Sequence, residues 1–370
     1  MKIAMIVKNY INNGIGTVVF NYSSALSKLG HNVDIIVSEE VAENKYIASC
    51  NAGLRVIKLP SKSKSFLKYY CALYRILKHG NYNLAHIHGN SGAIFPEICM
   101  SKLARLAVVC HCHNTQCNHI IIHKLFRRLV SVLSNERIAC SKAAGKWLFG
   151  NYDFQVLPNA FQTEHFRFNE HKRTQIRKVL GIGKDTLVIG NVARLNQQKN
   201  QAFLIRVFAV LHRIYPDSRL VIVGDGPERK NLKKQACISK IMDSTIFYGV
   251  ESDPSGLYSA FDVFAFPSFF EGLGISLIEA QISGLPCVVA DTVPEEAQIS
   301  KRFTRLSLIA GEKVWAKELC KFSDEKDSTR TLASSKCDAS CYEISNCIIK
   351  LIAIYEKTEA HAFTLKRGII

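Results

Sequence analysis

The sequence predicts an α/β protein with two Rossmann-like domains, each built on a doubly wound parallel sheet. Short apolar strands alternate with helical patterns as far as residue 139, and a second alternating series begins after a polar, charged stretch at 163–178. Such alternation is typical of parallel βαβ units. The chain has 370 residues, which is long for a single hydrophobic core and favours two domains. We expect the two domains to face each other across a cleft.

The first domain is expected over residues 1–160, where short apolar runs indicate strands and apolar residues at helical spacing indicate helices. The predicted strands are 2–8, 32–38, 54–58, 84–87, 107–112 and 136–139. The predicted helices are 17–29, 65–78, 93–104 and 124–133. The pattern ends at Val156-Leu-Pro-Asn-Ala160.

The second domain is expected over residues 161–341. Its predicted strands, each followed by a helix, are 187–192, 219–223, 245–248, 263–266 and 286–290. The polar residues 324–340 are expected to form a loosely ordered connection. A last helical pattern covers 342–357.

The charge of the chain favours an anionic partner. There are 48 basic and 31 acidic residues, a net charge of +17. Since no helix-turn-helix, RNA-binding or zinc-finger signature accompanies this charge, nucleic acid is not expected, and an anionic membrane leaflet is the better candidate. Two basic amphipathic segments, 62–78 and 124–130, have the composition of helices that lie on such a surface, although packing on a sheet explains most helices of this kind.

The sequence indicates a cytoplasmic protein. No apolar stretch is long enough to cross a bilayer, and the N-terminal run 1–7 is too short for a secretory signal. The 13 cysteines are scattered and odd in number, so reduced thiols are expected rather than a disulfide framework. We expect the protein in the cytoplasm, with peripheral attachment to the inner face of the cell membrane.

Two carboxylates flank a glycine-bearing turn that follows the strand 263–266. Glu271 lies on the turn, and Glu279 lies about two turns into the following helix. The N-terminus of that helix offers unpaired N–H groups and a partial positive charge, which suit a phosphate. One carboxylate is therefore predicted to contact a group beyond the phosphates, and the other to accept hydrogen bonds from a ribose.

A second group of polar residues follows the strand 187–192. Arg194 and Lys199 lie between this strand and the next helix, where an arginine fork and a lysine point charge can converge on a diphosphate. Gly224 lies in another strand-to-helix turn, which is expected to be mostly structural with its backbone close to the nucleotide. These cations and the helix end supply positive charge, and no Asp-x-Asp motif is present, so no metal or other cofactor is expected.

The first strand is followed by the turn Asn12-Asn-Gly-Ile-Gly16. Its glycines let the backbone pass close to a ligand. The turn is not the full Gly-x-Gly-x-x-Gly fingerprint, so NAD binding is only weakly indicated. An ordinary tight turn explains it equally well.

Three of these segments together resemble the retaining GT-B glycosyltransferases of family 4 (glycosyltransferase group 1). They are Glu271-Gly-Leu-Gly-Ile-Ser-Leu-Ile-Glu279, the Arg194…Lys199 pair and Val223-Gly-Asp-Gly-Pro. The later Pro294-Glu-Glu resembles the capsule and exopolysaccharide branch of the family. The resemblance implies a GT-B fold in which a C-terminal helix at about 342–370 returns to the first domain. The sequence departs from the family pattern at Ala160, Gln162, Ala193 and Asn200, which affects details of the hinge and loop but removes neither cation.

The resemblance also implies a function. It is the transfer of a sugar from a nucleotide-sugar donor, held by the second domain, to a saccharide acceptor entering from the first domain. The acceptor is expected to be lipid-linked, in capsular or extracellular polysaccharide biosynthesis. Glu271 and His113 are the expected catalytic residues, both contacting the donor sugar. Among the expected donor-binding residues, Arg194 and Lys199 bind the diphosphate and Glu279 binds the ribose. Gly16 lies near the phosphates and Gly224 lies close to the nucleotide. Backbone N–H groups near Leu273 and Gly274 bind the distal phosphate.

Other functions are weighed against this one. Assembly of lipopolysaccharide or glycolipid is the alternative among glycosyltransferases. A GT-B epimerase would not need the arginine–lysine pair together with both glutamates, and a phosphorylase would need a pyridoxal-binding lysine context. A non-catalytic scaffold on the same fold is disfavoured because all four charged residues are intact.

The segment 110–123 presents a zinc alternative because it is rich in cysteine and histidine. Cys110 and Cys112 end an apolar strand, so they should point away from His111 and His113, and no second Cys-x2-Cys knuckle is present. Zinc is therefore disfavoured here but left open. His86 and His88 end another strand, where structural packing is expected, with His88 the more exposed of the two.

Overall fold

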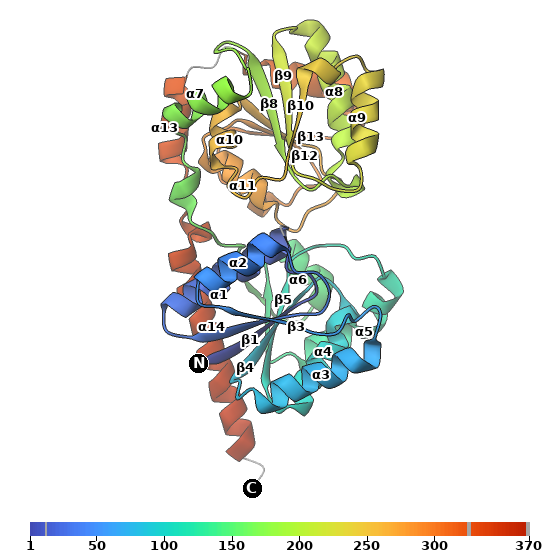
Figure 1. Ribbon diagram of the computed structural model, residues 1–370, viewed down its shortest axis with the longest axis vertical. Coiled ribbons are helices and arrows are strands. Elements are labelled where there is room, and N and C mark those ends of the chain that lie inside the picture. Colours follow the sequence, from blue (N-terminus) through green and yellow to red (C-terminus); the bar gives the residue numbers. More distant parts are fainter. Residues whose placement is uncertain (12, 324–326, 368–370) are drawn as a thin grey trace. The chain divides into compact units, whose positions relative to one another are not determined.

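The computed structural model describes residues 1–11, 13–323 and 327–367, with side chains described as far as residue 360. The chain divides into an N-terminal unit, Met1–Phe161 with Cys341–Ile370, and a C-terminal unit, Gln162–Ser340 (Figure 1). The sequence analysis places the boundaries after residues 160 and 341. The expected two parallel-sheet Rossmann-like domains are confirmed.

The N-terminal unit contains a seven-stranded parallel sheet in the order β3-β2-β1-β4-β5-β6-β7. Its strands are β1 (Lys2–Val7), β2 (Asn32–Val37), β3 (Arg55–Lys58), β4 (Leu84–Gly89), β5 (Ala107–Cys112), β6 (Glu136–Ala139) and β7 (Gln155–Val156). Its helices are α1 (Gly14–Lys28), α2 (Glu43–Asn51), α3 (Phe66–His79), α4 (Phe95–Leu103), α5 (Ile120–Leu133), α6 (Lys142–Phe149) and α14 (Ile344–Arg367). Strands β1, β2, β4 and β5 are buried along almost their whole length, as strands covered on both faces must be.

The C-terminal unit contains a six-stranded parallel sheet in the order β10-β9-β8-β11-β12-β13. Its strands are β8 (Leu187–Val192), β9 (Ser218–Val223), β10 (Thr245–Gly249), β11 (Val263–Phe266), β12 (Cys287–Ala290) and β13 (Phe303–Leu306). Its helices are α7 (Glu170–Val179), α8 (Gln201–Ile214), α9 (Arg229–Ile238), α10 (Ser255–Ala260), α11 (Ile275–Ile282), α12 (Gly311–Cys320) and α13 (Asp327–Lys336). Helices α8 and α12 cover one face with a core that includes Phe208 and Trp315.

The strand order reverses once in each sheet. In the C-terminal unit the reversal lies between β8 and β11, which are neighbours in the sheet but far apart in the chain. In the N-terminal unit it lies between β1 and β4. Ligands of open parallel sheets bind beyond the carboxyl ends of the strands at such a switch point. A ligand-binding site is therefore expected in the loops after these four strands.

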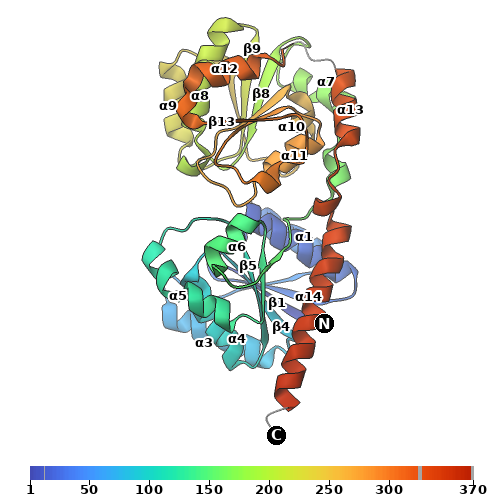
Figure 2. The same ribbon diagram turned by 180° about the vertical axis from the view of Figure 1, so that it is seen from behind.

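Helix α14 returns to the N-terminal unit, as the sequence predicts. It packs against α1 and β5, and Figures 1 and 2 show it running along this sheet. Cys347, Leu351 and Tyr355 are fully buried on its inner side. The helix begins at Ile344, two residues later than the predicted 342–357, and extends further.

One segment expected to be irregular is helical, and a second helix lies where no element was predicted. The sequence analysis assigns 324–340 to a loosely ordered connection, but Asp327–Lys336 forms α13, while residues 324–326 lie outside the described part of the chain. The polar stretch 163–178 contains most of α7. Both helices are held by buried arginines, whose partners are distant in sequence and leave no local signal.

Candidate functional site

The loop after β8 carries the two predicted cations. Its short 3-10 turn, Gln197–Lys199, is capped by Asn196, and α8 begins directly after it. Arg194 is exposed, and no described residue makes an ion pair or hydrogen bond with its guanidinium group. Its backbone carbonyl accepts a hydrogen bond of 3.2 Å from Gln201 Nε2, which fixes the loop. The arginine fork is therefore free to bind an anion.

Lys199 is joined to the loop that follows β11. Its Nζ lies 2.5 Å from Glu271 Oε1 and 5.0 Å from the centroid of the Phe266 ring. Gln198 reinforces the junction, because its carbonyl accepts from Phe269 N and its Nε2 donates to the Phe270 carbonyl, each at 2.9 Å. Lys199 was predicted to contact a phosphate and Glu271 the donor sugar. The structure brings the two side chains together, with both largely buried.

The N-terminus of α11 presents free backbone donors. Gly274 precedes the helix at φ +85°, where any side chain would be strained and would press on the Phe266 ring. Its carbonyl accepts from Leu277 N and Ile278 N. No described residue accepts a hydrogen bond from the N–H groups of Gly274, Ile275 or Ser276. Leu273, also expected here, is buried beside them.

Glu279 lies buried on α11 and accepts a hydrogen bond of 2.6 Å from the Tyr258 hydroxyl through Oε2. Burial raises the pKa of Glu279 from 4.5 to about 7, although the Tyr258 hydrogen bond acts in the opposite direction. Its Oε1 has no hydrogen-bond partner among the described residues. The sequence analysis did not identify Tyr258, which lies 21 residues earlier on α10.

The backbone at Gly224 lies in close contact with the backbone of the loop that carries Arg194. A side chain at Gly224 would overlap the Ala193 carbonyl, and one at Gly226 would overlap the Leu195 carbonyl. Leu195 N also donates to the Asp225 carbonyl at 2.9 Å. Glycine is therefore required for close contact between two backbones, which agrees with the mostly structural role expected for this turn.

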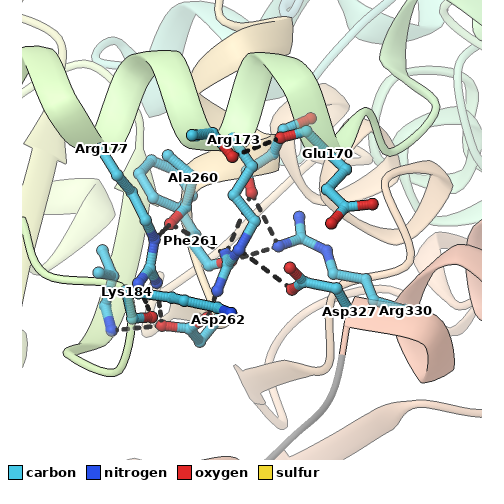
Figure 3. Close-up of polar contacts among 12 residues, drawn as sticks. Glu170, Arg173, Arg177, Lys184, Ala260, Phe261, Asp262, Asp327 and Arg330 are labelled. Atoms are coloured by element: carbon cyan, nitrogen blue, oxygen red, sulfur yellow. Dashed lines mark hydrogen bonds and ion pairs between the residues drawn. The ribbon is translucent and has the colours of Figure 1, made fainter.

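A buried arginine network holds the segment that carries Tyr258 (Figure 3). Arg173 and Arg177 of α7 donate to the two oxygens of Asp262 at 2.6 and 2.5 Å. Arg330 of α13 donates to the backbone carbonyls of Tyr258, Ser259 and Phe261 and to Ser283. These groups fix the end of α10, and with it the hydroxyl that contacts Glu279.

The other two residues predicted to belong to the site, Gly16 and His113, lie in the N-terminal unit. Gly16 lies in the first turn of α1, where its N–H donates to the Asn13 side chain at 2.8 Å. A side chain at Gly16 would overlap the Ile11 carbonyl. A glycine is thus required for the loop to fold over the start of the helix.

His113 follows β5 and is buried. Its Nδ1 lies 3.2 Å from Asn159 Oδ1, and its Nε2 lies 2.9 Å from His88 Nδ1. Burial lowers the pKa of His113 to about 4, so the ring is neutral at pH 7. His88 was expected to be the more exposed histidine of β4, but both His86 and His88 are buried.

The zinc alternative for the segment 110–123 does not match the structure. Cys110 and Cys112 are buried on the opposite face of β5 from His111 and His113, and His123 stacks on Trp147 with ring centroids 4.2 Å apart. Among the described residues, the group with metal-ligand spacing is His86, His88 and His111, without a cysteine.

At the switch point of the C-terminal unit, these features form one candidate anion site. A free guanidinium, a buried ammonium–carboxylate pair and three free N–H groups follow neighbouring strands β8 and β11. Such donors suit phosphate oxygens. A carboxylate with one free oxygen, Glu279, suits a pair of hydroxyl groups.

Comparisons with known proteins agree with this chemistry. Residues 12–165 match the family model of Glycosyltransferase Family 4, and residues 172–334 match that of Glycosyl transferases group 1. The chain is 30% identical to the putative glycosyltransferase EpsF of Bacillus subtilis (strain 168), over 86% of this chain and 87% of the relative. It is 24% identical to a UDP-Gal:alpha-D-GlcNAc-diphosphoundecaprenol alpha-1,3-galactosyltransferase of Escherichia coli, over 82% of each chain.

Solved structures share the fold. The crystal structure of Anabaena Alr3699/HepE in complex with UDP-glucose superimposes with a TM-score of 0.81 at 18% sequence identity, covering 96% of this chain and 100% of that one. WaaG, described as a glycosyltransferase involved in lipopolysaccharide biosynthesis, gives a TM-score of 0.74 at 17% identity, with coverage of 95% and 99%. The architecture is therefore the GT-B fold.

Proposed function

Because the chain belongs to the glycosyltransferase family, we propose that it transfers a sugar, with retention of configuration, from a UDP-sugar to a lipid-linked saccharide in extracellular or capsular polysaccharide biosynthesis. The UDP-sugar is chosen because the Escherichia coli relative is named for UDP-Gal and the Anabaena structure holds UDP-glucose. The lipid-linked acceptor is chosen because the same relative is named for a diphosphoundecaprenol substrate.

The observation that carries the proposal is the junction between the β8 and β11 loops. Arg194 and the free N–H groups of α11 would bind the diphosphate, and Lys199 would share its charge between Glu271 and the leaving phosphate. Fixed positive groups of this kind stabilise a departing nucleotide without a metal ion. The ion pair with Lys199 supports an orienting role for Glu271 at the donor sugar rather than that of a nucleophile.

Residues of the N-terminal unit are proposed to act on the sugar and the acceptor. His113 is neutral at pH 7, and its Nδ1 and Nε2 contact Asn159 and His88. It would therefore contact the donor sugar as a neutral group rather than as a cation, and a hydrogen bond to the sugar would replace one of these two contacts. Gly16 would let the backbone after β1 approach the phosphates.

The proposed activity can be tested directly. Purified protein is incubated with a panel of UDP- and GDP-sugars and lipid-linked acceptors in the presence of EDTA, and nucleotide release and the anomeric configuration of the product are measured. We expect release of UDP that does not depend on added metal, and a product with the donor's anomeric configuration. No turnover with any donor would favour a scaffold, and transfer to a diacylglycerol-type acceptor alone would favour glycolipid assembly.

The pKa of Glu279 predicts how donor binding depends on pH. Ribose hydroxyls donate to a carboxylate, so UDP affinity should rise with pH through about 7 and weaken by up to tenfold per unit below it. The effect on stability has the opposite sign. Because the folded-state pKa is raised, its contribution to stability is present below pH 4.5 and is lost as pH rises to about 7. Calorimetric titration of UDP from pH 5.5 to 8.5 measures the first effect, and Glu279→Gln should flatten it.

An apolar stripe on α5 supports attachment to a membrane. Ile121, Leu125, Leu129 and Val132 recur at helical spacing and are exposed, Ile121 by 80%, with Arg128 among them. Helix α4 packs between α3 and α5, and Figure 2 shows these helices on one side of the sheet. On α3, Leu67 is 77% exposed beside Lys68. No helix in the described part of the chain is long and apolar enough to span a bilayer.

Leu125→Glu should therefore weaken binding to vesicles that contain anionic lipid. Losing the burial of one leucine and adding a negative charge is expected to reduce the partition coefficient by at least about tenfold. Ile238→Glu is the matched control, because Ile238 is 72% exposed on α9 of the other unit. Co-sedimentation with vesicles measures both variants. Equal binding by the two would contradict the role of α5.

A further inference from the structure

Four histidines form a buried cluster in the N-terminal unit, and the proposed sugar transfer uses one of them. His86 and His88 belong to β4, and His111 and His113 lie at the end of β5. The ring centroids of His86 and His88 are 4.2 Å apart, and those of His111 and His113 are 4.1 Å apart. Met5 of β1 faces the same side, and its Sδ lies 3.5 Å from His88 Nε2.

The hydrogen bonds determine which nitrogen of His88 carries a proton. The amide oxygen of Asn159 only accepts, so His113 Nδ1 must donate to it. His113 Nε2 is then an acceptor, and His88 Nδ1 must donate to it across 2.9 Å. A neutral His88 ring with its one N–H at Nδ1 presents a lone pair at Nε2. This lone pair faces the thioether of Met5, which offers only lone pairs itself.

Further nitrogens in the cluster lack partners. His86 Nε2 is buried without a hydrogen-bond partner among the described residues, and neither ring nitrogen of His111 has hydrogen-bond geometry with a described residue, although the Leu157 backbone acts on that ring. Neutral imidazole, which has a lone pair on one nitrogen, is the form that ligates a metal. A buried polar group left unsatisfied costs about 1–3 kcal/mol, so several together indicate a missing electron-pair acceptor.

We propose that Met5, His86, His88 and His111 bind a soft metal ion, monovalent copper, inside the N-terminal unit. The three histidines offer ligand atoms that all lie within 4.8 Å of one another. A nitrogen and a sulfur ligand on one tetrahedral ion are about 3.5 Å apart at usual metal–ligand distances, which is the observed separation of His88 Nε2 and Met5 Sδ. Two nitrogen ligands are about 3.4 Å apart, so small ring rotations would complete the site.

The charge of the surroundings selects the ion. No carboxylate among the described residues acts on the pKa values of the four histidines. Burial of a divalent ion in such a neutral site would cost much more than burial of a monovalent ion. Imidazole with thioether is also a ligand set that favours Cu(I). Tyr355 Oη, 2.6 Å from His86 Nδ1, and His113 on His88 Nδ1 orient the ligating rings from outside.

The test compares Met5→Leu with Met100→Leu in the full chain. Exposed thiols are first alkylated, because cysteine also binds Cu(I). Cu(I) is then titrated without oxygen against a chromophoric copper chelator. Wild type and Met100→Leu should retain about one Cu(I) ion at least tenfold more tightly than Met5→Leu. The melting temperatures of these two proteins should rise by about 5–10 °C when the free Cu(I) concentration is a hundred times Kd. Leucine nearly conserves the volume of methionine, so Met5→Leu should fold.

X-ray absorption spectroscopy at the copper edge of the copper-loaded protein provides the second readout. We expect nitrogen neighbours with one thioether sulfur, and loss of the nitrogen shell in His111→Phe. Equal copper retention in wild type, Met5→Leu and His111→Phe would overturn the proposal, as would thiolate-only coordination. Zinc bound at these residues in preference to Cu(I) would overturn the choice of ion.

Discussion

Lys199→Met should lower kcat/KM for the sugar nucleotide by about 10²–10³-fold, since removal of one fixed donor at a developing negative charge costs about that much. Arg194 remains in the variant, so nucleotide binding should weaken but persist. The matched control is Lys321→Met. Lys321 also makes a 2.5 Å ion pair with a glutamate, Glu318, but its side chain is 59% exposed, and the variant should keep full activity.

A second variant separates catalysis from stability. Lys199→Met leaves the carboxylate of Glu271, which is only 6% exposed, without the lysine and should destabilise the C-terminal unit by about 3 kcal/mol. In the double variant Lys199→Met with Glu271→Gln, the buried negative charge is removed together with the lysine. Its melting temperature should return to near the wild-type value while its activity stays low. Recovery of activity together with stability would mean that the ion pair only supports the fold.

Asp262→Asn should be the most destabilising conservative substitution that we propose. Asp262 accepts from Arg173, Arg177 and Val188 N, and the two arginine side chains are only 10% and 5% exposed (Figure 3). The amide removes the counter-charge of Arg177 and leaves Arg173 only its second carboxylate, Asp327, 3.1 Å from Nε, which together costs about 3–5 kcal/mol. For a unit of this size, the melting temperature should fall by about 10 °C.

The control for this prediction is an exposed ion pair in the same unit. Glu312 lies 2.6 Å from Arg206, whose side chain is half exposed, and Glu312→Gln should change stability by less than about 1 kcal/mol. Thermal unfolding followed by circular dichroism measures both variants. An Asp262→Asn protein as stable as Glu312→Gln would show that α7 and α13 do not depend on the arginine network.

The central strands of both sheets were predictable because each is a short apolar run between turn residues. The strands Ala107–Cys112, Glu136–Ala139, Leu187–Val192 and Val263–Phe266 have the predicted bounds. Helices α7 and α13 were not predictable, because their buried residues are arginines and a serine, which are usually exposed. Asp262, the partner of the two α7 arginines, is 85 residues from Arg177, and no local pattern reports such a pair.

The candidate site was predictable where it depends on position along the chain. Residues that directly follow β8 and β11 meet at the switch point of the sheet, so the pairing of the two loops follows from the strand order. The contact of Lys199 with Glu271 rather than with open solvent was not predictable, nor was the hydroxyl of Tyr258 on Glu279. These contacts depend on side-chain packing between loops. The histidine cluster was missed because His86 and His111 were treated strand by strand.

A cationic loop and the α11 N-terminus in the C-terminal unit are proposed to bind a nucleotide diphosphate without a metal ion. Calorimetric titration of UDP into wild type, Arg194→Ala and Lys199→Met, each in EDTA, tests it most directly. Binding of UDP to wild type should be unchanged by EDTA, and binding to each variant should be at least about tenfold weaker. Binding that appears only with an added divalent ion, or that is equal in all three proteins, would contradict it.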